Sequence, residues 1–337
     1  MHTINHSGMP GKGTISFLRG VNSMHNSSAP LFVVDGMPVE EFGLFESNIE
    51  GNWYNPISTI DPSDISSISI LKGPTASSIY GSKAANGVVL IETLEAQSTQ
   101  TSIKLSIKSG VNLAAHPMIP QLKSKQYKTL ANEILASSHI KEEDYKEQYP
   151  GLYIEQGDDA YHRYKHNTRW QELIYSNSLI NEAYLSVEGG SEIATYGLSV
   201  GYHNEGGIIK NSNYDRFNVL FVSDLNIFPW FKLQVNANLA NVNSYLMESA
   251  VSPSTNPILT SLSKPPILAP YQFNEDGEQL TILDDVDELG TSNPAAVVKN
   301  FEGENNNYRL IASMKGQADL SKTLKWNTLL GLNVNTM

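Results

Sequence analysis

The chain of 337 residues contains no cysteine and is poor in charge. The absence of cysteine excludes disulfides, zinc–thiolate sites and cysteine nucleophiles. Charged residues make up 17% of the chain, below the quarter or so found in an average soluble domain. The formal net charge is −12, whereas binding to a phosphate backbone requires clustered Lys and Arg. We therefore expect no nucleic-acid partner.

Long hydrophobic runs are also missing. No stretch reaches the roughly 18 apolar residues that a membrane-spanning helix needs. The opening residues 1–6 have neither the basic start nor the apolar run of a signal peptide. If the protein is exported, the sequence must lack its beginning, and we expect it to be a fragment.

No enzyme motif is present. The segment 8–14 superficially resembles a phosphate loop, but a second glycine separates Lys12 from Thr14 and no strand precedes it. The eight histidines show no paired metal spacing, and no GxSxG motif occurs. The acidic patches 156–159 and 284–288 could bind calcium, but without a recognised loop spacing we interpret them as solvated loops. We predict no catalytic residue, no resident metal and no cofactor.

The most informative segment is residues 61–93. It predicts a strand marked by Ile65, Ile68 and Ile70, a break at Lys72-Gly73-Pro74, a short helix ending at Tyr80-Gly81, a turn over 83–87, and a second strand over 88–91. Upstream, 31–34 predicts a buried strand that ends in an Asp35–Gly36 turn. We expect residues 1–96 to form one small mixed α/β domain.

The middle of the chain has a different pattern. Apolar spacing after Ser124 predicts a helix over 124–137, with Ser124 as its cap. The acidic segment 141–159 is interpreted as a loop.

Strict alternation of apolar and polar residues predicts seven strands, near 101–113, 182–190, 194–204, 213–227, 230–245, 306–320 and 322–335. A soluble β-sandwich also alternates, but its strands run about 5–6 residues. These strands run roughly 9–14 residues, as tilted strands crossing a membrane do. The long connections at about 114–180 and 246–304 alternate with short turns, one of them the aromatic turn 228–231. The pattern favours a membrane barrel over a sandwich.

The sequence motifs, taken in order along the chain, resemble those of the SusC/RagA family of TonB-linked outer-membrane proteins of Bacteroidetes-type bacteria. The matching segments cover nearly the whole chain: 15–20, 30–36, 61–93, 170–174, 185–191, 201–211, 214–218, 271–277 and 293–294. The resemblance implies an α+β plug domain, here 1–96, followed by part of an antiparallel transmembrane β-barrel, here 97–337 with about 7 of 22 strands. The family's TonB-contacting segment precedes the plug, and we expect it to be missing.

The resemblance also implies function and partners. Family members import nutrients across the outer membrane, driven by TonB–ExbB–ExbD and often covered by a SusD-like lipoprotein. We expect an oligosaccharide or peptide ligand and contact with outer-membrane lipid. An importer of a siderophore or cobalamin, and a secreted β-rich glycan-binding or adhesin module, remain alternatives. We expect the chain alone to be inactive.

Particular residues of the plug motifs have predicted roles. Glycines 36, 73, 81 and 87 are expected in turns with positive φ, and Gly20 and Asp35 belong to the same motifs. Arg19 and Lys72 either contact carboxylates of the barrel wall or form ordinary salt bridges. Tyr80 either stacks on a sugar or is a buried tyrosine. Trp53 and Tyr54 are the candidates for an aromatic ligand contact.

Overall fold

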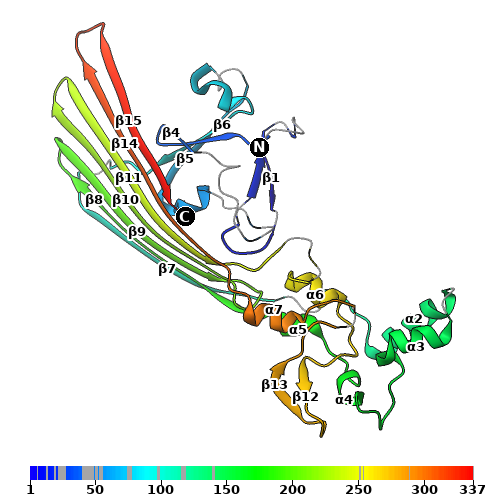
Figure 1. Cartoon of the computed structure of the whole chain (residues 1–337). Coiled ribbons are helices and arrows are strands. Elements are labelled where there is room, and N and C mark those ends of the chain that lie inside the picture. The colour runs from blue at the N-terminus through cyan, green and yellow to red at the C-terminus, as the bar shows by residue number, and fades with distance from the viewer. Residues whose placement is uncertain are drawn as a thin grey trace.

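Two β-sheets of different size, joined at one end to a group of helices, organise the chain (Figure 1). The computed structural model describes residues 1–337 except 6, 13, 19, 22–27, 40–48, 50–51, 53–55, 74–77, 97–98, 115–118, 139–140, 250–251, 253, 288 and 337. No helix among the described residues is both long and apolar enough to span a membrane.

The larger sheet contains seven long antiparallel strands in the order β15-β14-β11-β10-β9-β8-β7. Their bounds are β7 (Ser102–Asn112), β8 (Ser178–Gly190), β9 (Ala194–Gly206), β10 (Asn213–Phe228), β11 (Phe231–Tyr245), β14 (Glu304–Asp319) and β15 (Lys325–Thr336). All seven predicted strands are present, each within four residues of its predicted bounds. Within the described part of the chain the sheet is open, with β7 and β15 at its edges.

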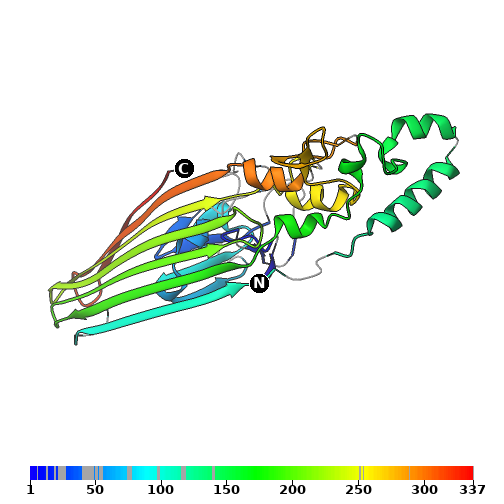
Figure 2. The same cartoon turned by 90° about the horizontal axis from the view of Figure 1, so that it is seen from below.

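The two ends of the large sheet differ. Short turns join β8 to β9, β10 to β11 and β14 to β15 at one end. The long connections, 113–177 and 246–303, both leave the opposite end, where the helices gather (Figures 1 and 2). The strands curve so that the sheet has a concave face (Figure 1).

The two faces of the large sheet have opposite chemistry. On β9, Leu198 is 44% exposed while its neighbour Ser199 is 4% exposed. On β10, Phe217 is 43% exposed while Asn218 is fully buried. A soluble sandwich buries its apolar face, whereas here many apolar side chains are exposed on the outward face and the covered face is rich in polar side chains, with a few apolar ones such as Leu220 and Val222. This is the arrangement of a lipid-facing barrel wall, and it confirms the predicted fold class of a plug followed by antiparallel strands.

The smaller sheet lies on the concave side of the larger one (Figure 1). It has the order β4-β3-β6-β5, formed by β3 (Leu31–Val34), β4 (Met37–Val39), β5 (Ile65–Leu71) and β6 (Val88–Thr93). Strands β3 and β6 are parallel and almost wholly buried, so their continuous apolar runs form the core of this domain. A separate hairpin pairs β1 (His2–Asn5) with β2 (Thr14–Phe17).

The two long connections are folded rather than irregular. The first contains α2 (Ser124–Ser137), α3 (Glu142–Gln148), η4 (Pro150–Leu152), α4 (Tyr161–Tyr164) and α5 (Trp170–Ile174). The second contains α6 (Pro257–Ser263), the hairpin β12 (Tyr271–Phe273) with β13 (Gln279–Leu283), and α7 (Pro294–Asn300). We call the described residues of 113–177 and 246–303 the connection unit.

Two predictions for the first connection were wrong. The segment 141–159 is not all loop, because α3 and η4 form there. Helix α2 has the predicted bounds, but its N-cap is Lys123, since Ser124 is already helical. The hydroxyl of Ser124 instead donates to the carbonyl of His166, which ties the start of α2 to the rest of the connection.

Candidate functional site

The contact between the small domain and the large sheet is centred on residues 56–64. This segment forms two short turns of 3-10 helix, η1 (Pro56–Thr59) and η2 (Pro62–Asp64). Asp61 caps η2, because its Oδ1 accepts a hydrogen bond from the N–H of Ser63 at 2.8 Å and Pro62 occupies the first helical position. The turns present backbone carbonyls and two carboxylates to the strands.

A buried ion pair joins this segment to β10. The Arg216 guanidinium lies 2.9 Å from Oδ2 of Asp61, and the two side chains are 9% and 1% exposed. Arg216 also donates to the carbonyl of Ser58 at 3.2 Å. Space for the Asp61 carboxylate comes from Gly201 on β9, where a Cβ atom would lie 2.7 Å from Oδ2. Two charges taken out of water need such close pairing.

Asp64 makes a second polar contact, with β8 and β9. Its Oδ1 accepts hydrogen bonds from the hydroxyl of Tyr184 at 2.9 Å and from the hydroxyl of Ser199. Burial raises the pKa of Asp64, partly opposed by these two hydrogen bonds. Within the described residues, its Oδ2 has no hydrogen-bond partner.

Two further residues of β10 extend the same line of contacts. The hydroxyl of Tyr214 donates to the carbonyl of Ser58 at 3.1 Å, and the amide of Asn218 donates to the carbonyl of Thr59. The strands therefore supply donors and the small domain supplies acceptors. The interface is specific yet polar. Because water satisfies the same groups, its separation costs less than opening an apolar core.

The connection unit holds itself together through backbone pairing of its two halves. The N–H of His166 donates to Ile267 at 3.1 Å, that of Thr168 to Pro266 at 2.8 Å, and that of Ala269 to Arg163 at 3.0 Å. Trp170, fully buried, donates its indole N–H to the carbonyl of Pro265 at 3.0 Å. The two connections are therefore one folded body although about a hundred residues separate them.

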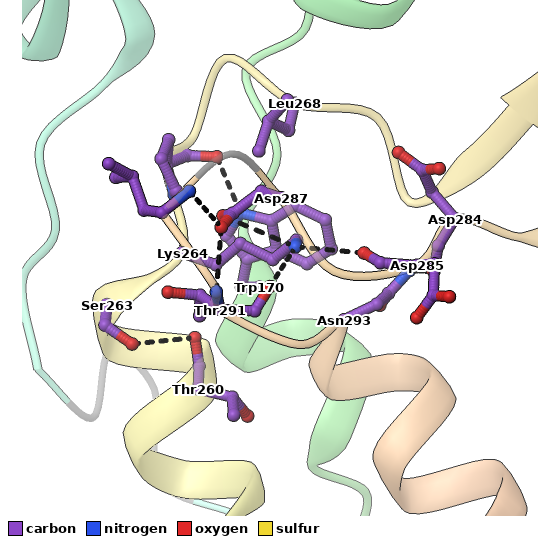
Figure 3. A network of polar contacts seen from close by, with 12 residues as sticks. Trp170, Thr260, Ser263, Lys264, Leu268, Asp284, Asp285, Asp287, Thr291 and Asn293 are labelled. Carbon is purple, nitrogen blue, oxygen red and sulfur yellow. Dashed lines mark hydrogen bonds and ion pairs between the residues drawn. The ribbon is translucent and has the colours of Figure 1, made fainter. Parts of the chain in front are cut away.

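A second buried ion pair lies inside the connection unit (Figure 3). Nζ of Lys264 is 3.5 Å from Oδ2 of Asp287, and both side chains are 1% exposed. Lys264 also donates to the carbonyl of Thr291 at 2.8 Å and lies over the ring of Trp170 at 5.6 Å. Burial lowers the pKa of Lys264, although Asp287 acts in the opposite direction.

The acidic segment 284–288 is therefore not simply the solvated loop that we predicted. Asp287 is buried and accepts from the N–H groups of Leu289 and Thr291. Asp284 pairs with Arg163 at 3.1 Å. These carboxylates are occupied by cations and backbone donors of the protein itself.

Positive φ was predicted for four glycines and is found at all four, Gly36, Gly73, Gly81 and Gly87, and Gly20 has a positive φ as well. Asp35 also has a positive φ, and its carboxylate accepts from the N–H and hydroxyl of Thr93 at 2.9 and 2.8 Å. The pKa of Asp35 is raised by burial. These residues shape turns of the small domain rather than one common site.

The remaining predicted residues do not lie together in one site. Lys72 is exposed and makes no ion pair in the described part of the chain, so the predicted salt bridge is not seen there. Tyr80 is half-buried against a cluster that contains Val33 and Val88. Arg19, Trp53 and Tyr54 lie outside the described residues.

The residues that make the interface were not among the predicted site residues. Asp61 and Asp64 are part of the 61–93 motif, and Arg216 lies within the matching segment 214–218. A signal was present at Arg216, because a cation in the middle of a long strand, on its polar face, needs a carboxylate partner.

Comparison with known proteins agrees with this architecture. The family model described as "TonB-dependent Receptor Plug Domain" matches residues 2–88. "TonB-dependent receptor SusC" of Bacteroides thetaiotaomicron is 27% identical over 331 residues, covering 90% of this chain and 29% of its own length. "TonB-dependent receptor P26" of Formosa agariphila is 29% identical over 326 residues, covering 95% and 29%. The chain thus spans under a third of these curated relatives.

Solved structures show the same fold. The RagAB peptide transporter matches with a TM-score of 0.75 at 20% identity, covering 99% of this chain and 38% of the other. The RagAB importer in its closed-closed state matches with a TM-score of 0.74 at 22% identity, covering 99% and 38%. Together, the plug match, the relatives named SusC and P26 and the RagAB structures support a fragment of a SusC/RagA-type TonB-dependent receptor, with a plug domain followed by seven antiparallel strands.

Proposed function

We propose that the intact protein imports a nutrient, either an oligosaccharide or a peptide, across the outer membrane of a Gram-negative, Bacteroidetes-type bacterium. The observation that supports this most directly is the two-faced sheet. Its apolar side chains point outward, as lipid contact requires, while its polar face holds the 56–64 segment of the plug. We assign residues 1–96 to the plug and 97–337 to the barrel with its connections.

The proposed mechanism needs no catalytic step. The plug is held by hydrogen bonds and one ion pair across its contact with β8, β9 and β10. Force transmitted through TonB–ExbB–ExbD would shift the plug against this polar surface, where water replaces each broken bond. A ligand held between plug and connection unit would then pass inward.

The proposed partner and ligand class are supported by the relatives. One relative is named SusC, and one structural neighbour is described as the RagAB peptide transporter. By analogy we propose a SusD-like lipoprotein above the connection unit. Because the chain spans 29% of the SusC relative, transport is proposed for the intact protein and not for these residues alone.

The test uses the native protein in its host. Outer membranes are extracted with detergent, the protein is captured with an antibody against α2, and co-purifying proteins are identified by mass spectrometry. We expect a lipoprotein in stoichiometric amount, and a gene deletion that slows growth on one glycan or peptide source. Recovery of the protein without detergent would instead indicate a secreted module. A growth defect only under iron or cobalamin limitation would indicate the chelate importer.

A further inference from the structure

The tip of the β1–β2 hairpin, residues Ser7–Lys12 without the neighbouring positions 6 and 13, reaches from the plug into the connection unit. The side chain of Met9 packs against a buried cluster formed by Ile174, Ile209, Met247 and Val298. These four residues come from α5, the β9–β10 connection, the start of the second long connection and α7. One plug side chain thus packs against a cluster whose members come from both halves of the connection unit.

The rest of the hairpin tip is fitted closely to the same end of the sheet. Pro10 is buried, and its Cδ would lie 3.5 Å from a Cβ at Gly207. Gly11 has a φ of +75°, and a Cβ there would lie 2.1 Å from the ring of Tyr214. Nζ of Lys12 donates to the hydroxyl of Ser249 at 2.6 Å. Burial lowers the pKa of Lys12 to about 8, which agrees with the closeness of this fit.

A second plug segment contacts the base of the second connection. The N–H of Leu246 donates to the carbonyl of Gly303 at 2.7 Å and so closes that connection at its two ends. Asn52 donates to the carbonyl of Met247 at 3.0 Å. Ile49 lies against Gly303, where a Cβ would be 2.5 Å from its Cδ1. Both plug segments therefore contact the ends of the second long connection, which contains α6 and α7.

We propose that the hairpin tip couples the position of the plug to the closure of the connection unit, with Met9 as the side chain that completes the unit's core. When the plug is in place, Met9 holds α5 and α7 against the start of the second connection. When the hairpin withdraws, the cluster loses one wall and the unit loosens. This inference rests on the proposed function, in which the plug moves.

Chain connectivity gives the coupling a direction. β1 is the first described strand and pairs only with β2 among the described strands, in a two-stranded sheet separate from the plug core. A pull on the chain ahead of β1 would therefore reach the hairpin before it reached β3 and β6. The connection unit would respond at the start of plug movement rather than at its end.

Hydrogen exchange of the intact, detergent-purified protein tests the coupling. We expect Met9→Ala to speed exchange of the backbone N–H groups of α6 and α7 about tenfold, because a core contact is lost locally. Exchange in α2, which lies away from the cluster, stays unchanged. The control is Met37→Ala, another half-buried plug methionine, which packs on a different cluster and against Gly331 of β15.

Met9→Leu restores apolar volume and is expected to restore protection, which separates loss of packing from a general folding defect. Equal effects of Met9→Ala and Met37→Ala on α7, or no effect of either, would overturn the coupling. The proposed function is judged separately, by growth on the ligand. Uptake without coupling would leave the importer assignment standing, and coupling without uptake would leave only the inference.

Discussion

The carboxylate of Asp61 and the guanidinium of Arg216 meet at 2.9 Å in the buried contact between plug and β10. Removing one partner leaves the other charge buried and unpaired. We expect Arg216→Met to weaken plug docking by about 3–5 kcal/mol. The double variant Asp61→Asn with Arg216→Met should lose much less than the sum of the two single changes. Plug docking in the two single variants and the double variant is measured by titrating each purified protein with urea and monitoring how readily the plug is cleaved by a protease. Additive losses would show that the pair is not coupled.

Gly201 provides the space for that carboxylate. A Cβ at this position would approach Oδ2 of Asp61 to 2.7 Å, so Gly201→Ala should cost about 1–3 kcal/mol through overpacking. Gly110→Ala on β7 is the matched control, since its Cβ would meet only Ile180 at 4.0 Å. Thermal unfolding should separate the two variants, and equal melting temperatures would contradict the steric argument.

Asp64 gives plug docking a dependence on pH. Because burial raises its pKa above the ordinary 3.8, the folded protein binds this proton more tightly than the unfolded chain does. Its stabilising contribution is fully present below 3.8 and is lost as the pH rises through the raised pKa. Relative to Asp64→Asn, the wild-type protein should therefore lose melting temperature as the pH rises above the ordinary carboxyl pKa of 3.8. A constant difference would mean that Asp64 does not titrate differently on folding.

Lys264 and Asp287 should be unequal in importance. Asp287→Ala leaves Lys264 buried without its carboxylate and also removes the acceptor for the N–H groups of Leu289 and Thr291. We expect a loss of about 3–5 kcal/mol in the connection unit. Lys264→Met retains an unbranched apolar side chain and leaves Asp287 its two backbone donors, so it should cost less. Hydrogen exchange in the 284–293 segment would rank the two variants, and the reverse order would contradict this account.

The outward face of the sheet should reject charge. Leu105 on β7 is 67% exposed on the apolar face, whereas its neighbour Ser106 lies on the face of Lys104 and Lys108. We expect Leu105→Arg to reduce insertion of the intact protein into lipid vesicles by about 2–4 kcal/mol, and Ser106→Arg to have little effect. Heat-modifiable mobility on gels gives the folded fraction. Similar folded fractions for both variants would argue against lipid contact at Leu105.

The strands could be predicted because the residue pattern that marks each of them lies within the strand itself. Alternation with a period of two marks each strand by itself, and all seven were found within four residues. The connections were harder. Helix α3 has only one buried residue, Tyr145, so it lacks an apolar stripe, although its three acids in the first turn are a helix-start signal. Asp61–Arg216 could not be predicted because the register between plug and sheet depends on contacts across 155 residues.

That separation has a consequence for how the molecule assembles. All six neighbouring pairs in the large sheet follow each other along the chain among the strands of this sheet, and four of the six are joined by short connections. The large sheet can therefore form by the stepwise pairing of successive strands. The plug is synthesised first, but Asp61 can pair with Arg216 only after β10 has paired with β9. Plug docking therefore includes the loop-closure entropy of a contact between residues far apart in the sequence. Until then the carboxylates of Asp61 and Asp64 remain solvated, and they lose their water only when the plug docks.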